Sequence, residues 1–211
     1  SEERVMLLSA MSLNDFSLEL ASSSPAPGGG SASAVAGALA ASLSSMVANL
    51  TIGKKGYEDY QDEMKALLIQ AEDLRNELML LMDQDSESFH QLLKAMKLPK
   101  NTDEEKIART EAIQASLKKS SEIPMQIAQK SFCVFALSRC VLLHGNKNAV
   151  TDALVSAMFA RTAVLGALLN VRINLLSIKD EFYVSEMRAK VDTLRAKTLI
   201  EESNLLEMSS F

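Results

Sequence analysis

The sequence predicts an all-α protein. Only four prolines and eight glycines occur among 211 residues, tryptophan is absent, and aromatic residues make up 5% of the chain. The chain is instead rich in Ala, Leu, Met, Lys and Glu, which are strong helix formers, and segments rich in β-branched and aromatic residues are scarce. The length suits one domain with a sizeable core, so we expect a single helical domain over residues 1–211.

Two helices are expected before residue 57. A short helix over about 12–22 ends at the proline- and glycine-rich run that occupies 22–30. An uncharged helix follows, from about 30 or 31 to 51. The sequence Gly-Lys-Lys-Gly at 53–56 ends it, because glycine supplies a C-cap and lysines complement the negative end of the helix dipole.

The next segment has the most regular apolar spacing in the chain. Apolar side chains recur at alternating intervals of three and four residues, which predicts one long amphipathic helix with a buried seam. Pro99 stops this helix after about residue 96. The seam positions are Tyr57, Tyr60, Met64, Leu67, Ala71, Leu74, Leu78 and Leu81.

Four further helices complete a compact bundle of about seven. Thr102, followed by three acidic residues, predicts a helix start, and that helix runs to about 121. Pro124 suits the first turn of another helix, which ends near 143. After a polar break, we expect the last two helices at about 149–178 and 181–207.

The helices at 31–51 and 149–178 are apolar nearly all round. One bundle of this size rarely buries two such helices completely, so a homodimer interface is expected to cover the remainder. Residues 28–53 carry no charge and are long enough to span a membrane. They consist mainly of Ala, Ser and Gly with few large apolar side chains, which favours a helix buried in a bundle over a membrane span.

Charge and cysteine content narrow the possible classes of protein. A net charge of −5 gives no support to nucleic-acid binding, which would rest on a basic surface. Cys133 and Cys140 are seven residues apart on one helix, about 10 Å, too far to form a disulfide, so we expect both reduced and buried. With only His90 and His144 besides, no zinc-type ligand cluster is visible and no metal is expected. The absence of a signal-peptide pattern predicts a cytoplasmic protein.

Asp85 is the strongest candidate for chemistry. It occupies the position that follows Leu81 in the apolar seam, where the pattern calls for an apolar residue. Burial disfavours the charged carboxylate and should raise its pKa toward neutrality, as a general acid/base requires. The alternative is a structural aspartate bonded to a backbone group or to an arginine such as Arg161 or Arg172.

The turn before the uncharged helix is a candidate binding site formed by Gly28, Gly29, Gly30 and Ser31. Glycines allow a sharp turn, and the free N–H groups of a helix start attract an anion or a carbonyl oxygen. A phosphate-binding P-loop would need a preceding strand and a Gly-Lys-Ser/Thr ending, neither of which is present. A tight turn that serves only close helix packing is equally compatible with the sequence.

Several polar residues on apolar helices are further candidates. Asn170 and Asn174 share one helix face, and Asn49 ends the uncharged helix. Buried amides must be hydrogen-bonded, either to another helix or to a ligand. Asp152 and Lys54 are further candidates. Each is equally explained by a favourable interaction of its charge with the dipole of the nearby helix.

Taken together, these segments resemble the family of formiminotransferase-cyclodeaminases and methenyltetrahydrofolate cyclohydrolases. The resemblance covers nearly the whole chain, and several blocks in the same order are more specific than any one of them. The blocks are Ser24–Ser31, Met46–Lys55, Asp83–Asp85, Ala95–Lys100, Gly145–Asn146 with Asp152, and Asn170–Asn174.

The resemblance implies an all-α homodimer that acts on a tetrahydrofolate derivative and has no tightly bound cofactor. It assigns the acid/base role to Asp85, and it implies a substrate site formed by Gly28, Gly29, Gly30, Ser31, Asn49, Lys54, Asn146, Asp152, Asn170 and Asn174. The blocks favour a methenyltetrahydrofolate cyclohydrolase, which hydrates 5,10-methenyltetrahydrofolate to 10-formyltetrahydrofolate. The alternatives are a formiminotetrahydrofolate cyclodeaminase, which releases ammonia, and a non-catalytic helical dimer that binds folate or a protein.

Overall fold

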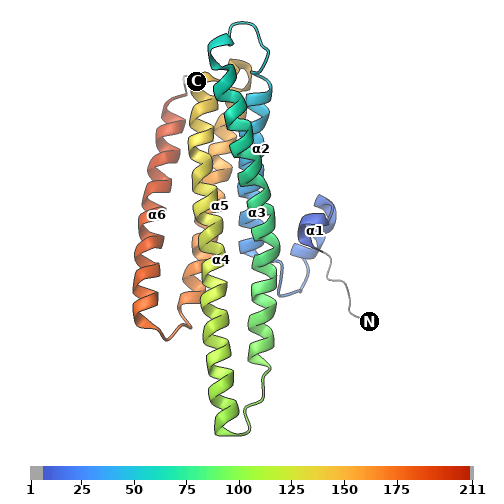
Figure 1. The fold of residues 1–211 in the computed structure, drawn as a ribbon, viewed down its shortest axis with the longest axis vertical. Helices are drawn as coiled ribbons and strands as arrows, with labels where there is room; N and C mark the ends of the chain where they lie inside the picture. The colour runs from blue at the N-terminus through green and yellow to red at the C-terminus, as the bar shows by residue number, and fades with distance from the viewer. Residues whose placement is uncertain (1–6, 210–211) are drawn as a thin grey trace.

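The computed structural model describes residues 7–209, and this part of the chain is all-α, as predicted. Five long helices run along one axis, α3 and α4 extend past the others, and the short α1 lies outside the bundle (Figure 1). The α-helices are α1 (Leu13–Leu20), α2 (Gly29–Asn49), α3 (Gln61–Met96), α4 (Asp103–His144), α5 (Val150–Leu175) and α6 (Glu181–Glu207). Short 3-10 helices occur at η1 (Leu8–Ala10), η2 (Glu58–Tyr60) and η3 (Lys147–Ala149).

Helix α2 packs against α3, α4 and α5 through small side chains. Ala34, Ala40 and Ala41 are fully buried on it. A Cβ atom at Gly37 would overlap the hydroxyl of Ser131 on α4, and one at Gly166 on α5 would overlap the hydroxyl of Ser33. Close approach of neighbouring helices therefore depends on the absence of side-chain volume along α2.

The apolar seam predicted on α3 is buried in the structure. Met64, Ala71 and Leu78 are fully buried, and Leu67 and Leu81 are at most 5% exposed. Three of the described helical stretches are, by length and composition alone, apolar enough to cross a membrane, namely Gly29–Asn49, Asp103–His144 and Lys147–Leu175. About half of the residues in their most apolar windows are buried inside the bundle, so packing accounts for part of this apolar character.

Helix α4 is continuous through Pro124, so the predicted break between residues 121 and 124 is wrong. A proline in a helix interior has no N–H to donate to the carbonyl four residues earlier, here that of Ser120. The side chain of Asn174 on α5 replaces the missing donor, with Nδ2 2.6 Å from the Ser120 oxygen. Asn174 lies fifty positions after Pro124 in the sequence, so no local pattern predicts this compensation.

We expect Asn174→Ala to destabilise the protein by about 1–3 kcal/mol, because it leaves a buried carbonyl without a donor. In a Pro124→Ala background, residue 124 regains an N–H that can donate to Ser120, so the same substitution should cost less. Urea unfolding of the four proteins of this cycle measures the coupling, with Asn204→Ala, an exposed asparagine on α6, as the control. Equal losses in both backgrounds would contradict this role for Asn174.

Candidate active site

The carboxyl group of Asp85 reaches from α3 to the first turn of α2. The N-cap residue of α2 is Gly28, which has no side chain with which to cap the helix. The hydroxyl of Ser31 donates to Oδ2 of Asp85 at 2.9 Å. Asp85 therefore places a carboxyl group from another helix at the start of α2, where the helix dipole favours a negative charge.

Of the three consecutive glycines, Gly30 is the one that this arrangement requires. A Cβ atom at Gly30 would lie 2.6 Å from Oδ2 of Asp85, closer than a Cβ atom in a folded protein comes to another side chain. A Cβ atom at Gly29 would lie 3.2 Å from Nδ2 of Asn170, and one at Gly28 would meet nothing within 4 Å. The missing side chain at Gly30 thus makes room for the carboxylate on the helix start.

Burial raises the pKa of Asp85 above the usual range for an aspartate, and the hydrogen bonds from Ser31 partly oppose that rise. The arginines considered as structural partners are engaged elsewhere. Arg161 pairs with Glu202 at 2.7 Å, and Arg172 pairs with Asp192 at 2.6 Å. A half-buried carboxyl group with a raised pKa and no arginine partner among these contacts has the properties of a general acid/base.

Helix α5 packs against the same first turn of α2 that Asp85 contacts. The side chain of Asn170 lies against Gly29 and donates to the Gly166 carbonyl at 2.9 Å. Asn174, one turn further along α5, is half-buried and donates to Ser120 as described above. The structure therefore brings together α2, α3 and α5 around Asp85, with glycine, hydroxyl and amide groups at one end of the bundle.

The other four residues predicted to bind substrate lie at the opposite end of α2. From Gly30 to Asn49 the helix rises by about 28 Å. Asn49 and Lys54 are exposed there, and Asp152 lies in the first turn of α5. Within one protomer these residues do not meet Asp85.

Asn146 is buried at that far end and ties two connections together. Its side chain donates to the Leu50 carbonyl at 3.0 Å and accepts from the backbone N–H of Asn148 at 3.1 Å. Its own backbone N–H donates to the hydroxyl of Thr51 at 2.8 Å. Sequence reasoning missed Thr51, a fully buried polar residue whose partner lies 95 positions away.

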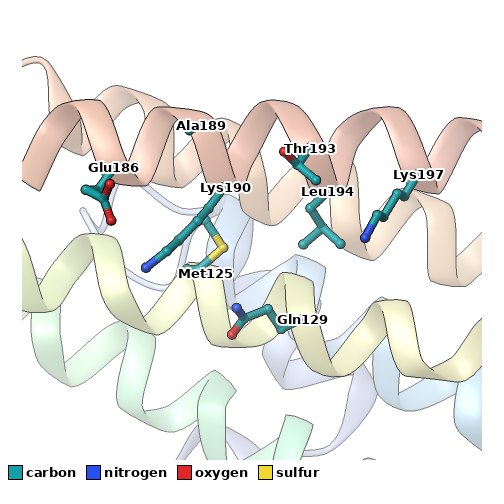
Figure 2. A pocket seen from close by; sticks show the side chains of 8 residues that line it. All are labelled: Met125, Gln129, Glu186, Ala189, Lys190, Thr193, Leu194 and Lys197. Carbon is teal, nitrogen blue, oxygen red and sulfur yellow. The ribbon is translucent and has the colours of Figure 1, made fainter.

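A separate hollow of about 350 Å³ lies between α4 and α6 (Figure 2). Lys190 and Lys197 extend over it from α6, and Gln129 faces it from α4. It lies on a different pair of helices from Asp85 and contains none of the predicted site residues. Its lining is Met125, Gln129, Glu186, Ala189, Lys190, Thr193, Leu194 and Lys197.

Comparisons with known proteins identify the family of this chain. A family model described as Formiminotransferase-cyclodeaminase matches residues 12–193. The methenyltetrahydrofolate cyclohydrolase of Methylorubrum extorquens is 40% identical over 178 residues, which cover 84% of this chain and 86% of that protein. The formimidoyltransferase-cyclodeaminase of Sus scrofa is 35% identical over 88% of this chain, although the match spans only 35% of that longer protein.

A solved structure has the same fold over almost the same length. The formiminotetrahydrofolate cyclodeaminase of Thermotoga maritima superposes with a TM-score of 0.84 and 31% identity, covering 94% of this chain and 96% of that one. The sequence resemblance is thereby confirmed by independent sequence and structural matches. This chain belongs to the formiminotransferase-cyclodeaminase family.

Proposed function

We propose that this protein is a methenyltetrahydrofolate cyclohydrolase. The observation that carries the proposal is the Asp85 carboxyl group, which has a raised pKa and is held by Ser31 at the start of α2. The bacterial relative that bears this name supports the choice, since it aligns over most of its own length with 40% identity. Cyclodeaminase activity is the second candidate, favoured by the Thermotoga relative, which also aligns over nearly its whole length.

In the cyclohydrolase reaction, water adds to the methenyl carbon that bridges N5 and N10 of the substrate. Asp85 as carboxylate takes a proton from that water, and the bond from the carbon to N5 then breaks. Asp85 returns this proton to N5, and the hydroxyl group on the carbon loses its own proton to solvent, so that the carbon stays on N10 as a formyl group. The substrate carbon is part of a cationic amidine-like system, so the carboxylate also stabilises the charge of the bound substrate.

In the cyclodeaminase reaction, N10 of 5-formiminotetrahydrofolate attacks the formimino carbon. The five-membered ring closes, and the carbon–nitrogen bond to the leaving amine breaks. The leaving nitrogen would take one proton from protonated Asp85 and the proton that N10 gives up on ring closure, and it leaves as ammonia. Both reactions act on the same kind of carbon and need one group that exchanges a proton, and a single carboxyl group with a raised pKa suits either.

The remaining candidate residues would bind and orient the substrate. Nδ2 of Asn170 donates to the Gly166 carbonyl and Nδ2 of Asn174 to that of Ser120, so each amide keeps its Oδ1 and one N–H for the donor and acceptor edge of a pterin. Asn49, Asp152 and Lys54 would join the site only from a second subunit, with Lys54 attracting the negatively charged glutamate tail. Asn146 is buried in its own protomer and serves there to hold two connections together. No tightly bound cofactor is required, and a cytoplasmic location stays a prediction.

The test follows the near-ultraviolet absorbance of 5,10-methenyltetrahydrofolate with pure protein, and then the appearance of that absorbance from 5-formiminotetrahydrofolate. Faster loss of the methenyl signal than in buffer supports the cyclohydrolase. Faster gain from the formimino substrate, without faster loss, identifies a cyclodeaminase instead. If the protein accelerates neither reaction above its rate in buffer, the non-catalytic helical dimer that binds folate or a protein becomes the favoured alternative.

The proposal includes a homodimer formed through α2 and α5. Exposed apolar side chains recur at helical spacing on both of these helices, which pack against each other, and exposed apolar side chains gathered in this way favour a protein interface. Asn170 and Asn174 lie on α5 as well, so the site borders these side chains. The exposed apolar side chains are Leu39, Met46 and Leu50 on α2, and Val155, Met158, Phe159, Leu169, Ile173 and Leu176 on α5.

We expect a mass twice the 23.0 kDa of one chain in sedimentation equilibrium. Ile173→Glu should shift this mass toward the monomer, because it would place a charge in an apolar interface. Ile107→Glu on α4 is the matched control, since both isoleucines are 61% exposed. A monomeric wild-type protein, or equal effects of the two substitutions, would exclude this interface.

A further inference from the structure

Three potential metal ligands meet at the end of the bundle remote from Asp85. Cys140 and His144 are four residues apart and share one face of α4, and Glu63 faces them from α3. One ligand atom from each residue lies within 4.8 Å of the other two. Nδ1 of His144 is already 2.8 Å from Oε2 of Glu63.

We propose that Glu63, Cys140 and His144 bind a single zinc-like transition-metal ion. A thiolate, an imidazole and a carboxylate are all zinc ligands, and with bond lengths of about 2.0–2.3 Å a tetrahedral site places its ligand atoms about 3.5 Å apart. Small side-chain movements would bring the three groups to these separations. The negative charges of Glu63 and Cys140 would balance a divalent ion.

The surroundings support a site with an open fourth position. All three residues line a cavity of about 670 Å³, in which a water molecule can complete the coordination. The ring of Tyr60 stacks on that of His144 with centroids 4.6 Å apart and an interplanar angle of 10°, which fixes the plane of the imidazole. Burial beside Glu63 raises the pKa of the Cys140 thiol to about 12, so the ion must displace a proton when it binds.

This site is separate from the proposed catalytic centre. Glu63 and Asp85 lie 22 residues apart on α3, which corresponds to about 33 Å along the helix. An ion held by Glu63 from α3 and by two residues from α4 would fasten these helices together next to η2. The expectation that the protein has no metal-ligand cluster considered only cysteines and histidines, and it missed the carboxylate that α3 supplies.

Cobalt(II) tests the proposal, because its spectrum reports both ligand type and geometry. Titration of chelator-treated protein should give one bound ion per chain, a sulfur-to-cobalt charge-transfer band in the near ultraviolet and intense tetrahedral bands in the visible. Zinc should abolish these bands by displacement. Cys140→Ser should remove the charge-transfer band and weaken binding by at least about 10–100-fold.

Cys133→Ser is the matched control, because Cys133 lies two turns earlier on α4 and lines the same cavity but is exposed and outside the ligand group. It should keep the full cobalt spectrum. Zinc should also raise the melting temperature of the wild-type and Cys133→Ser proteins, but not that of Cys140→Ser. Glu63→Gln is a second ligand variant, should Cys140→Ser fail to fold.

Two results would overturn the site. One is a weak octahedral cobalt spectrum without a sulfur band, and the other is equal binding by the Cys140→Ser and Cys133→Ser proteins. Neither measurement involves a folate substrate. Failure of the metal site would therefore leave the proposed activity of Asp85 untouched, and failure of that activity would leave the metal site intact.

Discussion

Asp85→Asn is expected to lower kcat by about 10²–10⁴-fold, the usual contribution of a positioned general acid or base. Asparagine has the shape of aspartate but exchanges no proton at physiological pH. Its amide oxygen can still accept the hydrogen bond from the Ser31 hydroxyl, so the contact between α3 and α2 is kept and the variant should fold. Loss of activity without loss of helical circular dichroism would separate a chemical role from a structural one.

The pH profile of the wild-type enzyme provides a second readout of the same group. The cyclohydrolase needs Asp85 as carboxylate, so kcat should fall as pH decreases through its pKa. Because burial raises that pKa, the fall should begin above the usual aspartate range. Asp83→Asn is the matched control. Asp83 accepts hydrogen bonds from Ser9, and its substitution should leave the fall in kcat at low pH unchanged. Full activity of Asp85→Asn on both folate substrates would end the acid/base proposal.

Gly30→Ala is expected to lower kcat by about 100-fold, even though alanine is the better helix former. The new methyl group would overlap the carboxyl group of Asp85, which must then leave its place on α2. A displacement of about 1 Å at a reacting group can cost a factor of this size. Helix propensity acts in the opposite direction, because alanine in place of glycine inside a helix favours folding by about 1 kcal/mol.

Gly28→Ala provides the comparison, because its methyl group would enter open space. It should leave kcat unchanged, and a change in KM alone would place the substrate next to the turn. Steady-state kinetics of the two variants, with unfolding midpoints measured in parallel, distinguish displacement of Asp85 from general damage. Equal kcat values for Gly30→Ala and the wild type would show that the contact is not catalytic.

The sequence predicts those parts of this fold that depend on local patterns. The seam of α3 predicts both its buried face and the anomalous carboxylate at Asp85, because one period describes the whole helix. The capping box at Thr102 and the break after Gly28 likewise depend on neighbouring residues, and the structure has helix starts at both places.

Local patterns do not predict features that depend on residues distant in the sequence. Pro124 predicts a helix break until the donor on Asn174 is known. Cys133 and Cys140 were both expected to be buried, but Cys133 is exposed and Cys140 is half-buried, because no periodicity fixes which face of a largely apolar helix points outward. The predicted binding residues all lie in sequence blocks that resemble the same family, but the structure places them at opposite ends of α2. In the proposed dimer, the orientation of the two-fold axis would decide which ends of α2 meet.

The small side chains along α2 have a consequence for how this protein can vary during evolution. At the buried positions of this helix, the neighbours limit volume more strictly than polarity. Serine is already accepted at fully buried positions such as Ser31 and Ser44, whereas a methyl group at Gly37 would collide with α4. Divergent sequences with this fold should therefore exchange Ala and Ser at buried positions in the first three turns of α2, but keep Gly at the positions of Gly30 and Gly37, where even a methyl group would collide with a neighbouring helix.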